Sequence, residues 1–309
     1  MPEPSYARDA YGKALVELGK SDSNVVVLDA DLSGSTRTAF FARKFPQRFF
    51  NMGVAEQDLI ATAAGIASCG KIVFVSTFSM FASIRALDQL RNTVVYNGFN
   101  VKIVATHGGL TVGEDGASHQ ALEDISFVRS LPGMRVIVPS DGEETRDAVL
   151  SAYKENGPFY IRIGRSKIPV LENKSKFSLG KGYILNEGKD IAVIACGIMC
   201  GQAMQALSLL KAEGINPYIV NIHTIKPIDK ELIVNLASKV KGFVVCEEHS
   251  IIGGLGSAVC ETLSESLPKP VRRIGTKDKF GQSGSSKDLL LEYGLTPENI
   301  AKSVKDLLL

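Results

Sequence analysis

The carboxylate with the clearest chemical potential is Glu56, in the stretch NMGVAEQDLIATAAGIA of residues 51–67. It begins a predicted helix over Ala55–Ser68 that is otherwise almost entirely small and apolar, which indicates a buried helix. A buried carboxylate is costly unless it has a partner, and such a group suits proton exchange. The alternative is structural, because the helix dipole favours an acid in the first turn.

Two phenylalanines offer a second candidate. Phe78 and Phe81 are three residues apart at a predicted strand-to-helix junction, within STFSMFASIRALDQLRNTV. This spacing places both rings on one face of the helix. They could form a wall for a flat aromatic ligand, or they could pack in an ordinary core.

A long polar loop, Thr106–Asp124 (THGGLTVGEDGASHQALED), contains His107, Asp115 and His119. Loops of this length inside a compact domain are usually functional, and these side chains could bind hydroxyls or phosphate or transfer protons. An exposed loop with incidental histidines is the alternative. The spacing matches no zinc-binding pattern and no thiol is near, so we predict no metal site in this chain.

Two further candidates directly follow predicted strands. The segment Asp29–Ser35 (DADLSGS) combines two acids and two serines, and it could bind a ligand or form a capped turn before a helix near Thr36–Lys44. Arg165 follows the strand Phe159–Ile163, and its fork of donors suits phosphate or carboxylate. A solvated charge in a linker is the alternative for Arg165.

The elements that must position these residues are predicted from alternating strand-like and helix-like stretches. Short β-branched runs predict buried strands at Asn24–Ala30, Lys71–Thr77, Val101–Thr106, Arg135–Ser140 and Phe159–Ile163. Helices are predicted at Ala55–Ser68, Ser79–Tyr96, Leu122–Ser130 and Gly142–Lys154. The alternation is typical of a parallel sheet, whose ligands bind beyond the carboxyl ends of the strands.

A second alternating series follows a polar stretch with Pro and Gly that we interpret as an interdomain linker. Its strands are predicted at Asp190–Cys196, Asn216–Ile222, Gly242–Glu247 and Val271–Ile274. Its helices are predicted near Gly201–Glu213, Asp229–Val240 and Ser257–Ser266, with a terminal helix from Thr296-Pro297. We therefore predict an α/β protein of two three-layer α/β/α domains in series, with residues 1–168 and 187–309 joined by the linker 169–186.

Composition excludes several classes of function. The chain has 309 residues, with 35 Lys and Arg against 33 Asp and Glu, so a dedicated nucleic-acid binder is not expected. No apolar run is long enough for a membrane span, and the N-terminus has no signal-peptide pattern. Five cysteines, an odd number, do not suggest a disulfide scaffold, and Cys196 and Cys200 are predicted as buried thiols. These features predict a cytoplasmic, reduced protein.

Five segments together resemble, in order and over essentially the whole length, the C-terminal section of transketolase. They are NMGVAEQD, GEDGASHQALED, TIKPID (Thr224–Asp229), EEHSIIGGLGSA (Glu247–Ala258) and FGQSGSSKDLL (Phe280–Leu290). The resemblance implies the pyrimidine-binding domain and the C-terminal domain of a thiamine diphosphate enzyme. It also implies transfer of a two-carbon ketol unit from a ketose phosphate to an aldose phosphate.

The resemblance assigns roles to individual residues. Glu56 matches the acid that hydrogen-bonds the aminopyrimidine ring and drives its imino tautomer, and it is expected to be catalytic together with His119. The cofactor-binding positions are Phe78, Phe81, Ile84 (where some members have an aromatic residue), Asp31 and Leu32. Asp115 and His119 match groups that contact sugar hydroxyls, and the phosphate-side positions are His107, Arg165, Arg8 and Ser35.

One family feature is absent from this sequence. Family members hold the diphosphate through Mg²⁺ on a Gly-Asp-Gly motif in an N-terminal domain, whereas this chain has only Glu-Asp-Gly at 114–116. The resemblance therefore implies a separate subunit of a split transketolase, which shares thiamine diphosphate with an N-terminal partner that holds Mg²⁺, as a heterotetramer. The alternatives are the β subunit of a 2-oxo-acid dehydrogenase, a relative that makes deoxyxylulose phosphate, and a non-catalytic α/β scaffold.

Overall fold

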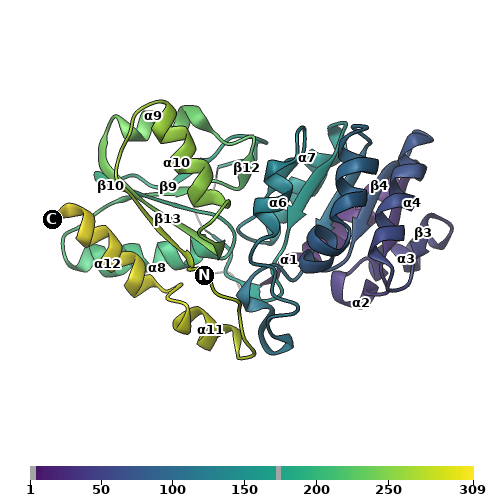
Figure 1. Cartoon of the computed structure of the whole chain (residues 1–309), viewed down its shortest axis with the longest axis horizontal. Coiled ribbons are helices and arrows are strands. Elements are labelled where there is room, and N and C mark those ends of the chain that lie inside the picture. Colours follow the sequence, from purple (N-terminus) through teal and green to yellow (C-terminus); the bar gives the residue numbers. More distant parts are fainter. Residues whose placement is uncertain (1–4, 172–174) are drawn as a thin grey trace.

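The computed structural model describes residues 5–171 and 175–309, so residues 172–174 of the predicted linker lie outside the described part. Two α/β domains lie side by side, each built on its own sheet with helices on both faces (Figure 1). The predicted fold class is therefore confirmed.

The first sheet has seven strands in the order β12-β6-β7-β5-β4-β2-β3, all parallel except β12. Each predicted strand of the first series is present. The strands are β2 (Val25–Asp29), β3 (Phe49–Asn51), β4 (Ile72–Ser76), β5 (Val101–Ala105), β6 (Arg135–Ile137), β7 (Phe159–Arg162) and β12 (Thr224–Lys226). A separate two-stranded ribbon pairs β1 (Ser5–Tyr6) with β8 (Lys167–Ile168).

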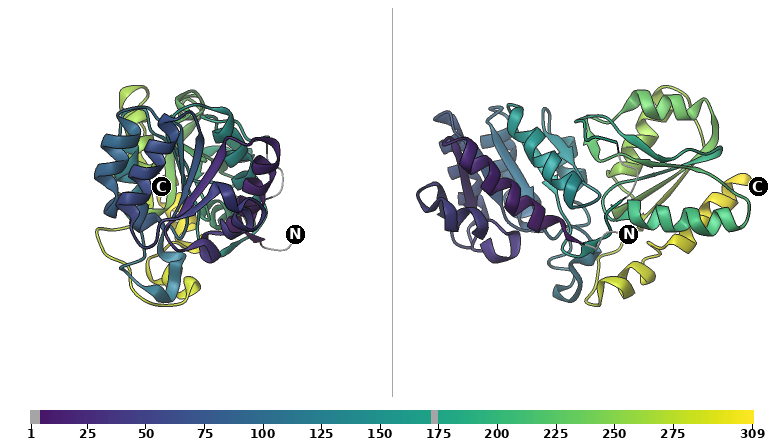
Figure 2. Two further views of the ribbon diagram at one scale, coloured as in Figure 1. Left: turned by 90° about the vertical axis from the view of Figure 1, so that its right-hand side faces the viewer. Right: turned by 180° about the vertical axis from the view of Figure 1, so that it is seen from behind.

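Helices cover both faces of this sheet. On one face α1 (Ala7–Ser21), α3 (Ala39–Lys44) and α7 (Gly142–Lys154) pack in one core cluster, and Figure 2 shows α1 lying across that face. The other face carries α4 (Glu56–Ser68) and α6 (Asp124–Ser130). The short helical segments are α2 (Ser33–Thr36), η1 (Pro46–Arg48) and η4 (Leu110–Asp115).

The segment predicted as one helix over Ser79–Tyr96 differs from the prediction. It divides into two wide π-helical stretches, η2 (Phe81–Arg85) and η3 (Leu90–Val95), around the short α5 (Leu87–Gln89). The wider turns still place buried residues against the core. A continuous α-helix was wrong here because apolar periodicity does not distinguish the two kinds of turn.

The second sheet has the order β14-β13-β10-β11-β9, with only β9 antiparallel. The strands are β9 (Tyr183–Asn186), β10 (Asp190–Ala195), β11 (Tyr218–Asn221), β13 (Val240–Ser250) and β14 (Val271–Thr276). The helices are α8 (Met199–Ala212), α9 (Lys230–Ala237), α10 (Leu255–Glu265), α11 (Ser286–Glu292) and α12 (Pro297–Leu308). As predicted, α12 begins after Thr296, whose side chain caps it.

The two domains share contacts that sequence reasoning did not anticipate. Strand β12 belongs in sequence to the second series, yet it pairs with β6 at the edge of the first sheet. One core cluster continues from Leu28 and Val75 in the first domain to Ile194 and Val245 in the second. The end of the predicted linker is also structured, since residues 183–186 form β9.

Candidate active site

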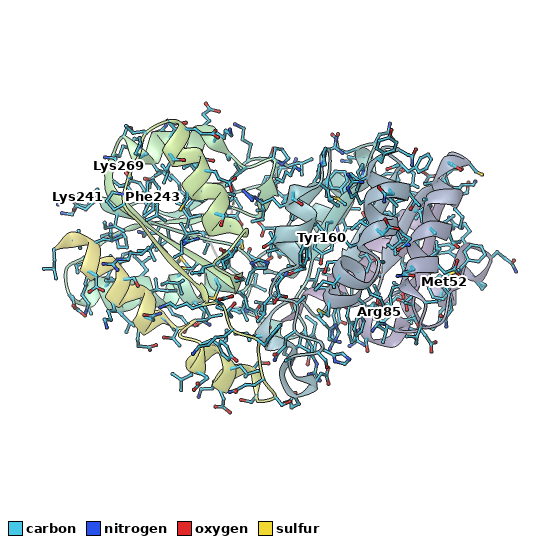
Figure 3. The ribbon with its side chains drawn as sticks, in the orientation of Figure 1. Met52, Arg85, Tyr160, Lys241, Phe243 and Lys269 are labelled. Atoms are coloured by element: carbon cyan, nitrogen blue, oxygen red, sulfur yellow. The ribbon has the colours of Figure 1, made fainter. Side chains whose placement is uncertain are left out.

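Glu56 is the first residue of α4, and its carboxylate is almost completely buried, with 2% of the residue exposed. Its Oε2 accepts a hydrogen bond of 2.9 Å from Nη1 of Arg85, at the end of η2 (Figure 3 labels Arg85). The Arg85 guanidinium also lies over the Phe81 ring, 4.2 Å from its centroid. The carboxylate therefore has the cationic partner that burial requires. Sequence reasoning missed Arg85, although a cation within an apolar helical stretch was an available signal.

Four rings form an aromatic cluster (Phe78, Phe81, His107 and His119) beyond the carboxyl ends of β4 and β5. The Phe78 ring stacks on His107 with centroids 3.8 Å apart and lies 6.0 Å from Phe81 in a stacked arrangement. His119 meets Phe81 edge-on at 5.3 Å. The structure thus joins the phenylalanines to the two loop histidines, and the prediction that Phe78 and Phe81 share a face is confirmed.

His107 is held as a neutral imidazole. Burial, together with the nearby guanidinium groups of Arg8 and Arg165, lowers the pKa of His107 to about 3. Its Nδ1 lies 2.9 Å from the hydroxyl of Thr106. At neutral pH the ring is therefore an uncharged hydrogen-bonding group within the field of the Arg8, Arg165 and Arg37 guanidinium groups.

This pKa has a consequence that can be measured. In the unfolded chain a histidine titrates near 6.5, so the unfolded state takes up a proton that the folded state rejects down to about pH 3. The contribution of His107 to stability is complete above about pH 6.5 and is lost as the pH falls towards 3. NMR titration of the histidine rings should find the His107 signals unchanged between pH 8 and pH 5. A midpoint near 6.5 for His107 would contradict the geometry.

Two of the phosphate-side candidates, Arg8 and Arg165, make hydrogen bonds within the chain. Arg8 donates from Nη1 to the carbonyl oxygen of Ser35 at 3.1 Å. Arg165 donates to the carbonyl oxygen of Val112 and to Glu114, and its Nη1 lies 4.0 Å from Oδ2 of Asp115. Part of the Arg165 donor set therefore holds the loop and leaves fewer donors for an anion.

Side-chain hydrogen bonds hold the turn after β2, but neither α2 nor α3 has a side-chain N-cap, and the helix predicted near Thr36–Lys44 is divided into these two. Asp29 is buried and accepts from the amide of Leu32 at 2.6 Å and from the hydroxyls of Thr36 and Thr38. Asp31 has a φ of +62° and its carboxylate accepts from the Asn51 side chain at 2.8 Å. Asp29 thus supports the turn, while Asp31 and Leu32 stand at the strand end.

The remaining cofactor candidate, Ile84, lies within η2 and is 38% exposed. It stands between Phe81 and Arg85 in sequence. No three His, Cys, Asp or Glu side chains gather to hold a metal ion within residues 5–171 and 175–309.

The glycine-rich turn of the second domain is filled by a side chain of this chain. Glu247, buried in β13, accepts from the amides of Leu255 at 2.7 Å and Gly256 at 2.8 Å, at the start of α10. A Cβ at Gly254 would lie only 2.0 Å from the Glu247 carboxylate. The close approach of the Glu247 carboxylate therefore explains why a glycine stands at position 254. Cys196 and Cys200 are buried free thiols, as predicted.

Comparisons with known proteins agree with this geometry. The family "Transketolase, pyrimidine binding domain" matches residues 4–170, and "Transketolase, C-terminal domain" matches residues 180–300. A Methanocaldococcus jannaschii protein described as a transketolase C-terminal section is 52% identical over 97% of this chain and 95% of its own length. The 6-deoxy-6-sulfo-D-fructose transketolase subunit SqwH of a Clostridium species is 39% identical, covering 98% and 95%.

A solved structure, described as a split-gene transketolase in an inactive β4 tetramer, superposes with a TM-score of 0.90. It is 48% identical, and the match covers 99% of both chains. The chain therefore belongs to the transketolase family. Within that family it corresponds to the C-terminal section, as the sequence motifs predicted. No helix among the described residues is long and apolar enough to cross a membrane.

Proposed function

We propose that this chain is the C-terminal subunit of a split transketolase, which transfers a two-carbon ketol unit from a ketose phosphate to an aldose phosphate. The observation that carries the proposal is the buried carboxylate of Glu56, whose partner Arg85 lies over the Phe81 ring. A buried carboxylate linked through one arginine to an aromatic cluster suits an aminopyrimidine ring, which offers both a flat face and a ring nitrogen.

Thiamine diphosphate, when bound, supplies the nucleophilic carbon that carries the ketol unit. The residues of this chain would orient the cofactor and control one proton. Glu56 would hydrogen-bond the pyrimidine ring and hold the shared proton there, while Phe78 and Phe81 would stack on the ring. Asp31, Leu32 and Ile84 would border it.

The sugar phosphates would lie on the other side of the aromatic cluster. Asp115 and His119 would hydrogen-bond sugar hydroxyls, and His119 would also move a proton during transfer. Arg8, Ser35 and Arg165 would form the phosphate side with His107. This arrangement is supported by the guanidinium groups of Arg8 and Arg165, which are among the charges that act on His107.

We further propose that the diphosphate and Mg²⁺ are held by an N-terminal transketolase subunit, in a cytoplasmic heterotetramer with sites at the subunit interfaces. The relative described as an inactive β4 tetramer of a split-gene transketolase supports the need for a second type of subunit. We keep residues 1–168 and 187–309 as the two domains of this subunit. Reconstitution with the N-terminal section from the same genome, followed by a ketol-transfer assay, tests the proposal.

Replacing His119 by alanine should separate catalysis from cofactor binding. The ring lies at the edge of the aromatic cluster, so its loss should lower kcat/KM for the sugar phosphates about 100-fold or more while the Kd for thiamine diphosphate changes little. Steady-state kinetics and titration with the cofactor, both on the reconstituted complex, provide the two numbers. Comparable losses in both would assign His119 a structural role instead.

A further inference from the structure

The loop that contains His107, Asp115 and His119 is held by the second domain. At its centre, Thr111 donates its amide to Oε1 of Glu248 at 2.6 Å. The Thr111 carbonyl oxygen accepts from Ser286 at 3.0 Å and from Ser166 at 3.2 Å. Both backbone polar atoms of Thr111 are therefore fixed, and two of these three contacts come from the C-terminal domain.

The fit between Glu248 and the loop is close. Glu248 lies in β13 and is 5% exposed. Gly109, with a φ of +89°, packs directly against its carboxylate, so that a Cβ there would lie 2.3 Å from Cδ of Glu248. No side chain other than hydrogen fits this position without displacing the loop or the glutamate.

Two further residues, Arg162 and Gln120, fix the C-terminal end of the loop. Arg162, buried in β7, donates from Nη2 to the carbonyl oxygens of Ala121 at 2.9 Å and Glu248 at 3.0 Å. Gln120 donates from its side chain to the carbonyl oxygen of Gln282 at 2.9 Å. The motifs EEHSIIGGLGSA and FGQSGSSKDLL thus supply loop contacts, although none of their residues belongs to the aromatic cluster.

We propose that Glu248 is a positioning residue for the active site: by accepting the Thr111 amide it holds the loop so that the His119 ring stays against Phe81 in the aromatic cluster. The expected effect of Glu248 on the rate rests on the proposed function. Its expected effect on the position of the loop rests on the structure alone. Glu248 belongs to the second domain, whereas all the residues proposed to contact the cofactor or the sugars lie in the first domain. The second domain would therefore contribute to the reaction by positioning the loop.

The effect on the loop can be tested in the chain alone. The His119 ring lies edge-on to Phe81, so its proton resonances carry a ring-current shift that depends on loop position. Glu248→Ala should remove this shift, whereas Glu248→Gln, which keeps an acceptor oxygen, should retain it. His223 of the second domain, stacked on Phe177 of the linker segment, reports that the fold is intact.

The neighbouring Glu247 offers a matched control. It is buried on the same strand and also accepts backbone amides, but those amides belong to α10 and not to the loop. Glu247→Ala should therefore leave the His119 signals in place. Gly109→Ala breaks the contact from the loop side and keeps Glu248, so it should also remove the His119 ring-current shift. It therefore tests the inference even if Glu248→Ala does not fold.

In the reconstituted complex, Glu248→Ala should lower kcat about 10- to 100-fold with an unchanged Kd for thiamine diphosphate, and Glu248→Gln should restore most of the rate. Glu247→Ala should stay near the parent rate. The inference would be overturned if the His119 signals kept their parental positions in both Glu248→Ala and Gly109→Ala. It would also be overturned if Glu247→Ala lowered kcat as much as Glu248→Ala. A parent complex without ketol transfer would refute the proposed function alone, because the spectra test the loop independently.

Discussion

The chain without a partner subunit is expected to show no ketol transfer above background, even with saturating thiamine diphosphate and Mg²⁺. Glu56 and the aromatic cluster provide the pyrimidine side of a site, and diphosphate binding requires cationic or metal-assisted contacts that we assign to the partner. Addition of the N-terminal section should raise the rate from background to ordinary enzyme turnover, on the order of 1–1000 per second. A coupled assay of aldose phosphate consumption measures both states.

The control for this experiment is the N-terminal section alone, which lacks Glu56 and should also be inactive. Titrating one section against the other should give a maximum at equal amounts. Robust turnover by the isolated chain would refute the split-subunit proposal. Activity that appears only with a lipoyl-domain protein and a 2-oxo acid would favour the dehydrogenase alternative.

Replacing Glu56 by glutamine should lower kcat of the reconstituted complex about 10²- to 10⁴-fold, the usual contribution of a positioned proton-transfer group. Glutamine matches glutamate in shape, and its carbonyl oxygen can still accept from Arg85, so folding and assembly should be retained. Only the ability to exchange a proton with the pyrimidine ring is removed. Kinetics and size-exclusion chromatography of the same samples provide the comparison.

Asp58 supplies a matched control for Glu56, since it is a second acid in the first turn of α4 but is exposed. Asp58→Asn removes the same charge from the same helix end and should leave kcat within about twofold, as expected for a surface substitution. A Glu56→Gln enzyme with parental turnover would show that the carboxylate only stabilises the helix start. Equal losses in both variants would indicate a helix-dipole effect.

Much of the fold was predictable because its signals are local. Continuous β-branched runs such as residues 24–30 and 190–196 became the buried strands β2 and β10. Asp141, a residue type that favours helix starts, caps α7 by accepting the Glu144 amide. Helix α1 was not predicted, although Tyr11, Leu15 and Leu18 follow a helical period and are buried. Helix α1 could therefore have been predicted from this spacing.

Other features depend on contacts between distant residues. The pairing of β12 with β6 joins Thr224 to Ile137 and Lys226 to Val136, which are far apart in sequence, and no local pattern in TIKPID indicates which sheet it will join. The ion pair of Glu56 with Arg85 and the hydrogen bond of Glu248 to Thr111 are of the same kind. The candidate residues themselves could be found because side chains that follow parallel strands meet at one edge of the sheet.

Strand β12 gives the protein a particular dependence between its two halves. Without residues 224–226, the outer edge of β6 would present unpaired backbone groups to solvent, which is a template for association with another chain. The second domain thus supplies the strand that covers this edge of the first domain's sheet. A break in the chain near residue 170 would divide it between its two family domains. The two fragments should still fold as one cooperative unit, because the sheet edge of the first is completed by β12 of the second.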